Sequence, residues 1–537
     1  MRRLSIFLVG VLIVLSGCST QTTVESSNTG TASNQVSEET ATSEVQDDTS
    51  QEESLPIRLA YSSCDSDAID PLTEADRPEW RTFRFDCPTD RVAAPEALPA
   101  MELGAEVEPC MLEDKSPPRL NAISRGVPDE DYVVGFPRSE SPWLLPDTQL
   151  KIAFVPVDFI DYKDDVDPLS FAEPAAKMMD EFYAMYTRGA VSFEWYLHDS
   201  WITINESIYN FVQSESTAAA QWSQQNRSVV DGFWQAAIEA SDPFVDFTDV
   251  DMVYFVMPRD QDAAQEFNLW PPSSNAYQTE EGDIRRGFVP GSYQFRPDKS
   301  LWAFWIHETL HYFRLPDLYW HDQNSIKRSE YTLPGAMQGY DIMTNQDGVS
   351  KALSTWLMWL AGWLEDDEIA CLTKDVIGEG SIEISPVHID DGKHKSVIVP
   401  MSETKAVVIE SRRKTQFDVD KEVNRSRDGV IVYVVDTEIQ NGSGLATVIA
   451  PKGRTLVRME EAATNGDINL DAVLYEGNFL EIGGIKIEVA SAWETSDTIN
   501  ISLVEDWQSG DEPEYVCFTK ANRDLAVDYL LPCPIVF

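Results

Sequence analysis

The sequence predicts an α+β protein, and three stretches of the chain support that prediction. Between residues 150 and 258, buried-strand patterns alternate with amphipathic helix patterns, as expected where helices cover a sheet. Residues 300–313 are strongly apolar and contain no Gly or Pro, which is typical of a buried helix. From residue 382 onward, short β-branched runs separated by Gly, Asp and Asn are typical of an antiparallel β-sandwich.

The N-terminus has the pattern of a bacterial export signal. Two arginines precede a short apolar run, and Leu15–Cys18, with the sequence Leu-Ser-Gly-Cys, resembles the cleavage box of bacterial lipoproteins. This resemblance implies that residues 1–17 are removed as a lipoprotein signal peptide and that Cys18 carries lipid. An ordinary signal peptide is the alternative. We therefore expect a protein that is lipid-anchored at the cell surface, on the outer face of a bacterial membrane.

The residues after the signal are polar, and the whole chain is acidic. Residues 18–55 are rich in Ser, Thr, Glu and Asp and contain no aromatic residue. Such a segment cannot bury enough apolar surface to fold, so we expect a disordered acidic tether. The chain has 41 Lys and Arg against 91 Asp and Glu, a formal net charge of -50. This charge repels phosphate backbones and argues against a nucleic acid partner.

Seven cysteines indicate a disulfide framework. If Cys18 carries lipid, six remain in an oxidising compartment, and they favour three disulfides because no Cys-x-x-Cys spacing occurs. Short loops favour Cys64 with Cys87 and Cys517 with Cys533, which leaves Cys110 with Cys371. We therefore expect residues 56–145, which show little periodicity, to form a disulfide-pinned N-terminal segment.

Two folded domains and a tail are predicted to follow. Residues 146–368 form the first domain, residues 369–510 the β-sandwich domain, and residues 511–537 a C-terminal tail that contains cysteines. In the first domain the patterns predict, in order, a strand at 150–162, a helix at 173–187, an alternating strand at 190–204, a helix at 217–241, a strand at 251–258, and helices at 300–313 and 350–365.

Two histidines and a glutamate interrupt the apolar helix at 300–313. His307 and His311 are four residues apart, so their imidazoles lie on one face of the helix and can reach one zinc ion. Glu308 points about 100° around the helix from His307. In that direction a carboxylate can take a proton from a metal-activated water and does not bind the metal itself. With only 6 histidines in 537 residues, a chance His-Glu-x-x-His match is rare. The motif predicts a zinc metallopeptidase.

The third ligand must come from another part of the backbone. Pro316 ends the helix, and Asp317 lies six residues after His311, the offset of the third ligand in the extended motif. We therefore expect Asp317 to complete the zinc site. His321, or an acidic residue elsewhere in the chain, is the alternative.

Residues around this helix resemble a known family. "HETLHYFRLPDLY" (307–319) and "GYDIM" (339–343) are similar to the zinc peptidases of the immune inhibitor A family. Further similarity extends over roughly residues 150–505, in "VPVDFID", "STWLMWLAGWL", "VVIESRRKTQFD" and "GVIVYVVD". The resemblance implies a zincin-like catalytic domain. It implies that His307, His311 and Asp317 are zinc ligands and that Glu308 is the general base. It also implies that Met343 lies in a methionine turn.

The chain also departs from the family pattern. Arg314 stands where relatives usually have Gly, a residue that readily adopts a left-handed conformation. Arg314 must either adopt that conformation with strain or form a different turn. Tyr340 replaces the Trp of a Trp-Asp-Ile-Met sequence, and Trp320 stands where an Asp is common. Zinc binding is still expected with these changes. The efficiency of peptide hydrolysis is the property that they affect.

Other residues have two interpretations each. Tyr319 and Tyr340 could donate to an oxyanion or serve only in packing. Cys110 could cap a catalytic metal as an inhibitory thiolate in place of forming a disulfide. A group of aspartates could hold Ca²⁺ or form a solvated acidic loop; these are Asp161, Asp164, Asp165 and Asp167.

The sequence therefore predicts a surface-anchored, zinc-dependent endopeptidase that acts on protein or peptide substrates. Its reaction would use a metal-activated water with Glu308 as general base. The alternative from another class is a non-catalytic cell-surface binding or adhesion lipoprotein that retains the peptidase fold. A zinc hydrolase of non-peptide substrates is a third possibility. Whether residues 56–145 are a removable inhibitory segment stays open at this point.

Overall fold

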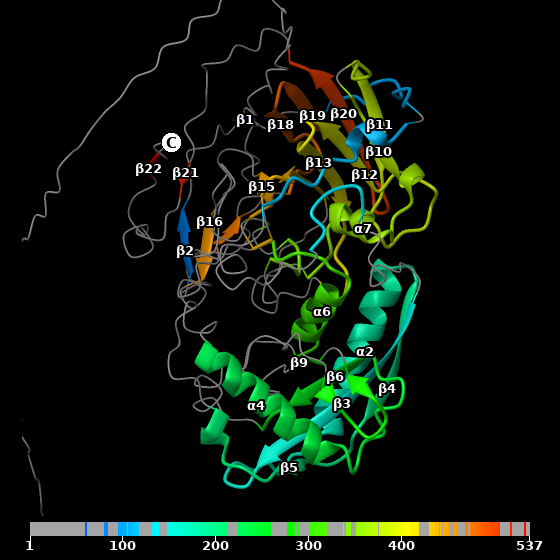
Figure 1. Cartoon of the computed structure of the whole chain (residues 1–537). Helices are drawn as coiled ribbons and strands as arrows, with labels where there is room; N and C mark the ends of the chain where they lie inside the picture. Colours follow the sequence, from blue (N-terminus) through cyan, green and yellow to red (C-terminus); the bar gives the residue numbers. More distant parts are fainter. Residues whose placement is uncertain are drawn as a thin grey trace, which may run out of the picture. The chain divides into compact units, whose positions relative to one another are not determined.

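In the computed structural model the described residues all lie within Ser54–Phe537, and Figure 1 draws them in colour. The predicted signal peptide, Cys18 and the tether up to residue 55 lie outside these residues. The described residues are 59–61, 80–83, 95–104, 106–117, 132–138, 148–211, 224–258, 277–284, 287–288, 301–318, 337, 340–344, 351–373, 375–417, 429–439, 441–442, 444–449, 456–459, 468–470, 473–504, 516–517 and 531–532. Among these residues, no helix has the length and apolar character needed to cross a membrane.

A mainly parallel sheet supports the histidine-containing helix. Its strand order is β4-β3-β6-β9, and β5 pairs with the end of β3. The bounds are β3 Thr148–Phe159, β4 Val191–Leu197, β5 Ile202–Ile204, β6 Met252–Val256 and β9 Gly287–Phe288. A separate short hairpin joins β7 Tyr277–Gln278 and β8 Asp283–Ile284. Strand β3 is a nearly continuous run of buried residues, as expected for a central parallel strand with both faces covered.

Helices cover both faces of this sheet (Figure 1). Helices α2 (Leu169–Tyr186) and α6 (Leu301–Tyr312) share a core with Ile152 and Phe154 of β3. Helix α4 (Gln224–Ser241) packs against the alternate residues of the same strand, including Ala153 and Val155. The period of two along β3 therefore places α6 on one defined face.

Two five-stranded sheets form the second half of the described chain. Their orders are β1-β18-β19-β20-β11 and β10-β12-β13-β14-β15. Residues from both, among them Ile384, Val407 and Ile487, share one apolar core. The bounds are β1 Leu59–Tyr61, β10 Ile369–Cys371, β11 Gly380–Ile384, β12 Ser396–Pro400, β13 Lys405–Arg412, β14 Gly429–Asp436, β15 Ala446–Ile449, β18 Phe479–Ile482, β19 Ile485–Ala492 and β20 Asp497–Leu503. The pairing is antiparallel except between β10 and β12, which run parallel.

Smaller elements complete the described structure. Strand β16 pairs with β2 and β17, and β21 pairs with β22. Their bounds are β2 Trp80–Phe83, β16 Leu456–Met459, β17 Ile468–Leu470, β21 Val516–Cys517 and β22 Leu531–Pro532; the 3-10 helices are η2 Glu108–Cys110, η3 Ile208–Phe211 and η4 Asp366–Glu368.

The prediction of a mixed helix and sheet protein is confirmed, with two local corrections. The stretch 190–204 is not one strand, because an exposed turn at residues 199–200 separates β4 from β5. The helix expected at 350–365 is only α7, Thr355–Ala361. It begins late because Ser354 is extended, and it ends at Gly362, which has a positive φ of 77°. The predicted domain boundaries stay predictions.

A buried carboxylate joins α7 to the β-sheet. Glu410 of β13 is fully buried and accepts hydrogen bonds from the Thr355 backbone N–H at 2.7 Å and the Tyr433 hydroxyl at 3.0 Å. Arg412 forms an ion pair with the same carboxylate. Because buried charge is costly unless it is paired and hydrogen-bonded, this network fixes α7 on the sheet.

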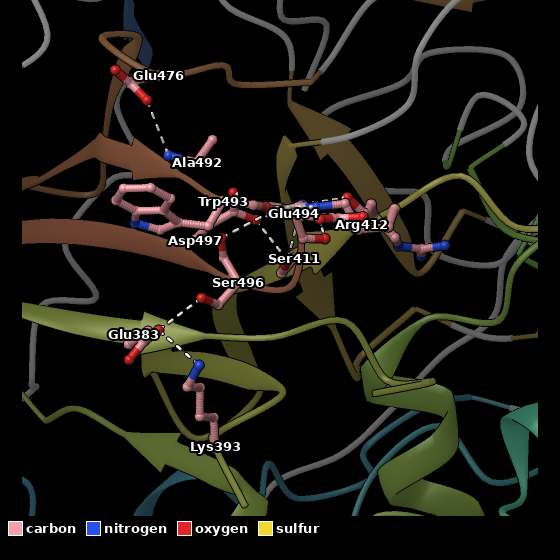
Figure 2. Close-up of polar contacts among 11 residues, drawn as sticks. Glu383, Lys393, Ser411, Arg412, Glu476, Ala492, Trp493, Glu494, Ser496 and Asp497 are labelled. Atoms are coloured by element: carbon pink, nitrogen blue, oxygen red, sulfur yellow. Dashed lines mark hydrogen bonds and ion pairs between the residues drawn. The ribbon is translucent and has the colours of Figure 1, made fainter. Parts of the chain in front are cut away.

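A second buried ion pair fixes the end of β13 to the β19–β20 hairpin. The Arg413 guanidinium donates to both carboxylate oxygens of Asp497, at 2.8 and 2.9 Å, and to the backbone carbonyl of Ser496. Ser411 donates to the same carboxylate at 2.6 Å. Figure 2 shows the labelled Ser411 beside Asp497 and, in the same hairpin, the exposed Trp493. This bidentate arrangement is the geometry that Arg favours for carboxylates.

A disulfide joins the N-terminal segment to the β-sheet. Cys110 in η2 is bonded to Cys371 in β10, so this predicted pairing is confirmed and the alternative of an inhibitory thiolate at Cys110 is wrong. The other two predicted pairings fall on residues or side chains outside the described ones, namely Cys64, Cys87, Cys517 and Cys533.

Removal of this disulfide is expected to destabilise the protein. The bond joins residues separated by 261 positions, so it restricts the unfolded chain strongly. We expect the double variant Cys110→Ala, Cys371→Ala to lose about 2–5 kcal/mol of unfolding free energy. Urea unfolding of the two proteins measures the difference. Coincident transitions would show that the bond contributes nothing.

Candidate metal centre

Helix α6 ends in a tight left-handed turn. The Leu315 N–H donates to the Leu310 carbonyl at 3.2 Å, and the Arg314 N–H donates to the His311 carbonyl at 3.0 Å. This pair of bonds is a Schellman motif, whose turn residue is usually Gly. Here that residue is Arg314, with φ of 67°. The strained alternative raised by the sequence is therefore the one observed, and such a conformation costs roughly 1–3 kcal/mol.

The turn brings a carboxylate back to the two histidines. Asp317 Oδ1 lies 3.3 Å from His307 Nε2 and 3.1 Å from His311 Nε2. The three side chains are nearly buried and offer ligand atoms that all lie within 4.8 Å of one another. Among the residues that the structure describes, this is the group of His, Cys, Asp and Glu side chains that could hold a metal ion.

Backbone carbonyls fix the tautomers of both histidines. His307 Nδ1 lies 2.9 Å from the Ile342 carbonyl, and His311 Nδ1 lies 2.9 Å from the Leu315 carbonyl. A carbonyl only accepts hydrogen bonds, so each Nδ1 must carry the proton. In the neutral rings each Nε2 lone pair then faces Asp317. Two lone pairs and a carboxylate oxygen repel one another unless a cation lies between them, so this donor set fits a metal ion.

The backbone of Asp317 is held by the turn after β14. Its N–H donates to Asn441 Oδ1 at 2.7 Å, and its carbonyl accepts from the Gly442 N–H at 2.9 Å. The next residue, Leu318, donates to the Met343 carbonyl at 2.9 Å. Sequence reasoning missed Asn441, because it lies 124 positions away and belongs to no motif.

Residues 341–344, which include Met343, contact His307 through a backbone carbonyl. Ile342 supplies the carbonyl that His307 contacts, and its own N–H donates to Ala352. Asp341 is fully buried, and its carboxylate accepts hydrogen bonds from the backbone N–H groups of Met343 and Ser354, both at 2.7 Å. Burial raises the pKa of the Asp341 carboxyl, while these hydrogen bonds oppose that shift. Asp341 had no predicted role, although it lies within the quoted motif.

Glu308 lies beside the ligand group in a dry environment. Its side chain is almost completely buried, and burial raises the pKa of its carboxyl to about 7. The negative charge of Asp317 also raises this pKa, and His307 lowers it. Thr309, on the other side of the helix, donates to the Trp305 carbonyl and bonds to the Tyr254 hydroxyl of β6. These contacts hold α6 on the sheet.

The N-terminal segment borders the site. The Tyr132 ring meets the His311 ring edge-on, with centroids 5.4 Å apart, and the Val133 N–H donates to the Arg314 carbonyl at 3.0 Å. Val133, Val134 and Phe136 are buried in the main core. Residues 132–136 therefore belong to the folded core next to the metal group, a role that no pattern in the sequence indicated.

The remaining predicted site residues are not part of the ligand group. Met343 and Tyr340 are buried in the main core, and the burial of Tyr340 favours its packing interpretation. Tyr319, Trp320 and His321 lie outside the described residues.

In the loop considered for Ca²⁺, Asp161, Asp164 and Asp167 accept hydrogen bonds from nearby groups. Asp161 accepts from Ser207 and Ile208, and Asp164 accepts from the N–H groups of residues 165 and 166.

Comparison with known proteins adds no assignment: no protein-family model and no curated protein matches this chain. The function must therefore be inferred from the geometry of the site and from its residues.

Proposed function

We propose that this protein is a zinc-dependent endopeptidase with a zincin-like catalytic domain. The observation that supports it most strongly is the convergence of His307 Nε2, His311 Nε2 and Asp317 Oδ1, with the Glu308 carboxyl buried beside them. Two imidazole nitrogens and one carboxylate oxygen are a normal donor set for zinc. Calcium and magnesium prefer sites built from oxygen ligands alone. The resemblance to the immune inhibitor A peptidases agrees with this choice.

Each residue then has a defined task. A zinc ion bound here would polarise the scissile carbonyl and lower the pKa of a coordinated water. Glu308, which does not belong to the ligand group, takes a proton from the attacking water and later gives it to the leaving nitrogen. The Ile342 and Leu315 carbonyls orient the His307 and His311 rings through Nδ1, so Nε2 is the ring nitrogen that each histidine would offer to the metal. No covalent bond forms between the enzyme and the substrate in this mechanism.

Hydrolysis of a broad peptide library by the purified full chain tests the proposal. We expect cleavage that stops when a chelator removes the metal and returns when zinc is added back. Cleavage that persists in excess chelator would contradict a metallopeptidase. Zinc binding without cleavage of any peptide would favour the alternative of a cell-surface binding lipoprotein or a hydrolase of other substrates.

We propose further that the enzyme acts at the cell surface through lipid on Cys18. The Cys18→Ser variant is expected to move from the membrane fraction to the soluble fraction, since it lacks the thiol to which lipid is attached. Fractionation with a lipid label measures this. A Cys18→Ser protein that still sediments with membranes and carries label would show that the anchor lies elsewhere.

A further inference from the structure

We propose that Asn441 is a positioning residue for the third metal ligand, so that the β-sheet region completes the metal centre. This inference rests on the proposed metal site. It concerns how Asp317 is held in place and not how the substrate reacts. The residue belongs to the turn between β14 and β15, 124 positions after the ligand that it contacts.

Asp317 depends on this contact because its own segment has no regular structure. It lies after the end of α6, in residues 315–318, which form neither helix nor strand. His307 and His311, in contrast, are fixed by the helix that carries them. A ligand outside regular structure needs other partners for its backbone, since buried N–H and C=O groups must be paired.

The turn after β14 supplies both partners. Asn441 Oδ1 accepts the Asp317 N–H at 2.7 Å, and the Gly442 N–H donates to the Asp317 carbonyl at 2.9 Å. A backbone N–H can only donate, so the amide oxygen of Asn441 must face Asp317. Gly442 has φ of 69°, a conformation that Gly adopts without strain. Together the two residues hold the Asp317 backbone from both sides.

The direction of the Asp317 side chain follows from this arrangement. With its N–H and C=O both bound, the backbone is held in an orientation from which Oδ1 lies within 3.3 Å of both Nε2 atoms. Loss of the Asn441 acceptor would leave a buried N–H unpaired and release this constraint. Outer partners that orient metal ligands typically contribute roughly 10 to 100-fold in metal affinity.

Zinc affinity of the purified full chain, measured by competition with a chromophoric chelator, tests the proposal. We expect Asn441→Ala to bind zinc about 10 to 100-fold more weakly than wild type. Asn441→Asp keeps an acceptor oxygen at the same position and should restore an affinity close to that of wild type. Asn441→Leu keeps the volume without the acceptor and should behave like Asn441→Ala, so it serves if the alanine variant fails to fold.

Asn500 provides a matched control. It is also a buried asparagine of the β-sheet region, and its amide binds the backbone of residues 96 and 98 far along the chain. Asn500→Ala should lower the melting temperature of the metal-free protein without changing zinc affinity. Equal zinc affinity of Asn441→Leu and wild type would overturn the proposal, as would an equal loss in Asn500→Ala. Because the readout is zinc binding, the result stands whether or not the protein cleaves peptides.

Discussion

Replacement of Glu308 by glutamine is expected to abolish peptide hydrolysis while zinc binding stays intact. Glutamine has nearly the same size but cannot accept the proton, and Glu308 is not among the three residues of the ligand group. Loss of a general base typically lowers the rate by roughly 10² to 10⁴-fold. Turnover of a peptide substrate and zinc affinity, measured on the same preparation, give the two readouts.

A control is needed because Glu308 is buried. The carboxylate of Glu368 in η4 is mostly shielded, pairs with Arg188 at 2.6 Å and does not belong to the ligand group. Glu368→Gln should keep both turnover and zinc affinity. Undiminished turnover of Glu308→Gln would end the proposed mechanism, whereas loss of both activity and zinc binding would indicate that Glu308 supports the site structurally.

Replacement of Asp317 by alanine is expected to have the largest effect on metal binding. It removes the carboxylate oxygen that lies within 3.3 Å of both histidine nitrogens. The loss of zinc affinity should exceed the roughly 10 to 100-fold that follows from loss of an outer partner, because a direct ligand is removed. Zinc titration of the chelator-stripped protein measures it.

His321→Ala is the matched comparison for Asp317→Ala, since His321 was the alternative ligand. We expect His321→Ala to bind zinc as wild type does. The reverse pattern, with tight binding in Asp317→Ala and loss in His321→Ala, would mean that the left-handed turn at Arg314 directs a different residue to the metal.

The part of the site that could be predicted from sequence is the part that local geometry fixes. His307 and His311 lie four positions apart on one helix, so their relative placement follows from the helical repeat alone. Asp317 follows from the same motif through a short turn. Even the strain at Arg314 was visible as an unusual residue at a position where Gly is expected.

The supports of the site could not be predicted in this way. Asn441 contacts Asp317 across 124 positions, and Tyr132 reaches His311 from the N-terminal segment. Glu410 is a charged residue inside an apolar strand, and its role depends on Thr355 of a distant helix. Such contacts leave no periodic signal, because they depend on how separate elements pack and not on the repeat of any one of them.

The helices and strands also divide into those that a local pattern predicts and those whose ends depend on tertiary contacts. Strand β3 and helix α6 were predicted well because each has a long, uniform pattern. Helix α7 was predicted too long, since the backbone N–H of Ser354 binds the buried carboxylate of Asp341, Ser354 is extended, and residues 351–353 form no helix. A tertiary contact therefore overrides the local helical preference at that end.

The most direct test of the proposed centre is an anomalous difference map at the zinc absorption edge, from crystals of the protein grown with zinc. We predict one strong peak bonded to His307 Nε2, His311 Nε2 and a carboxylate oxygen of Asp317, with bond lengths of about 2.0–2.2 Å. Absence of a peak between these three residues, or a zinc ion bound by other residues in its place, would contradict the account.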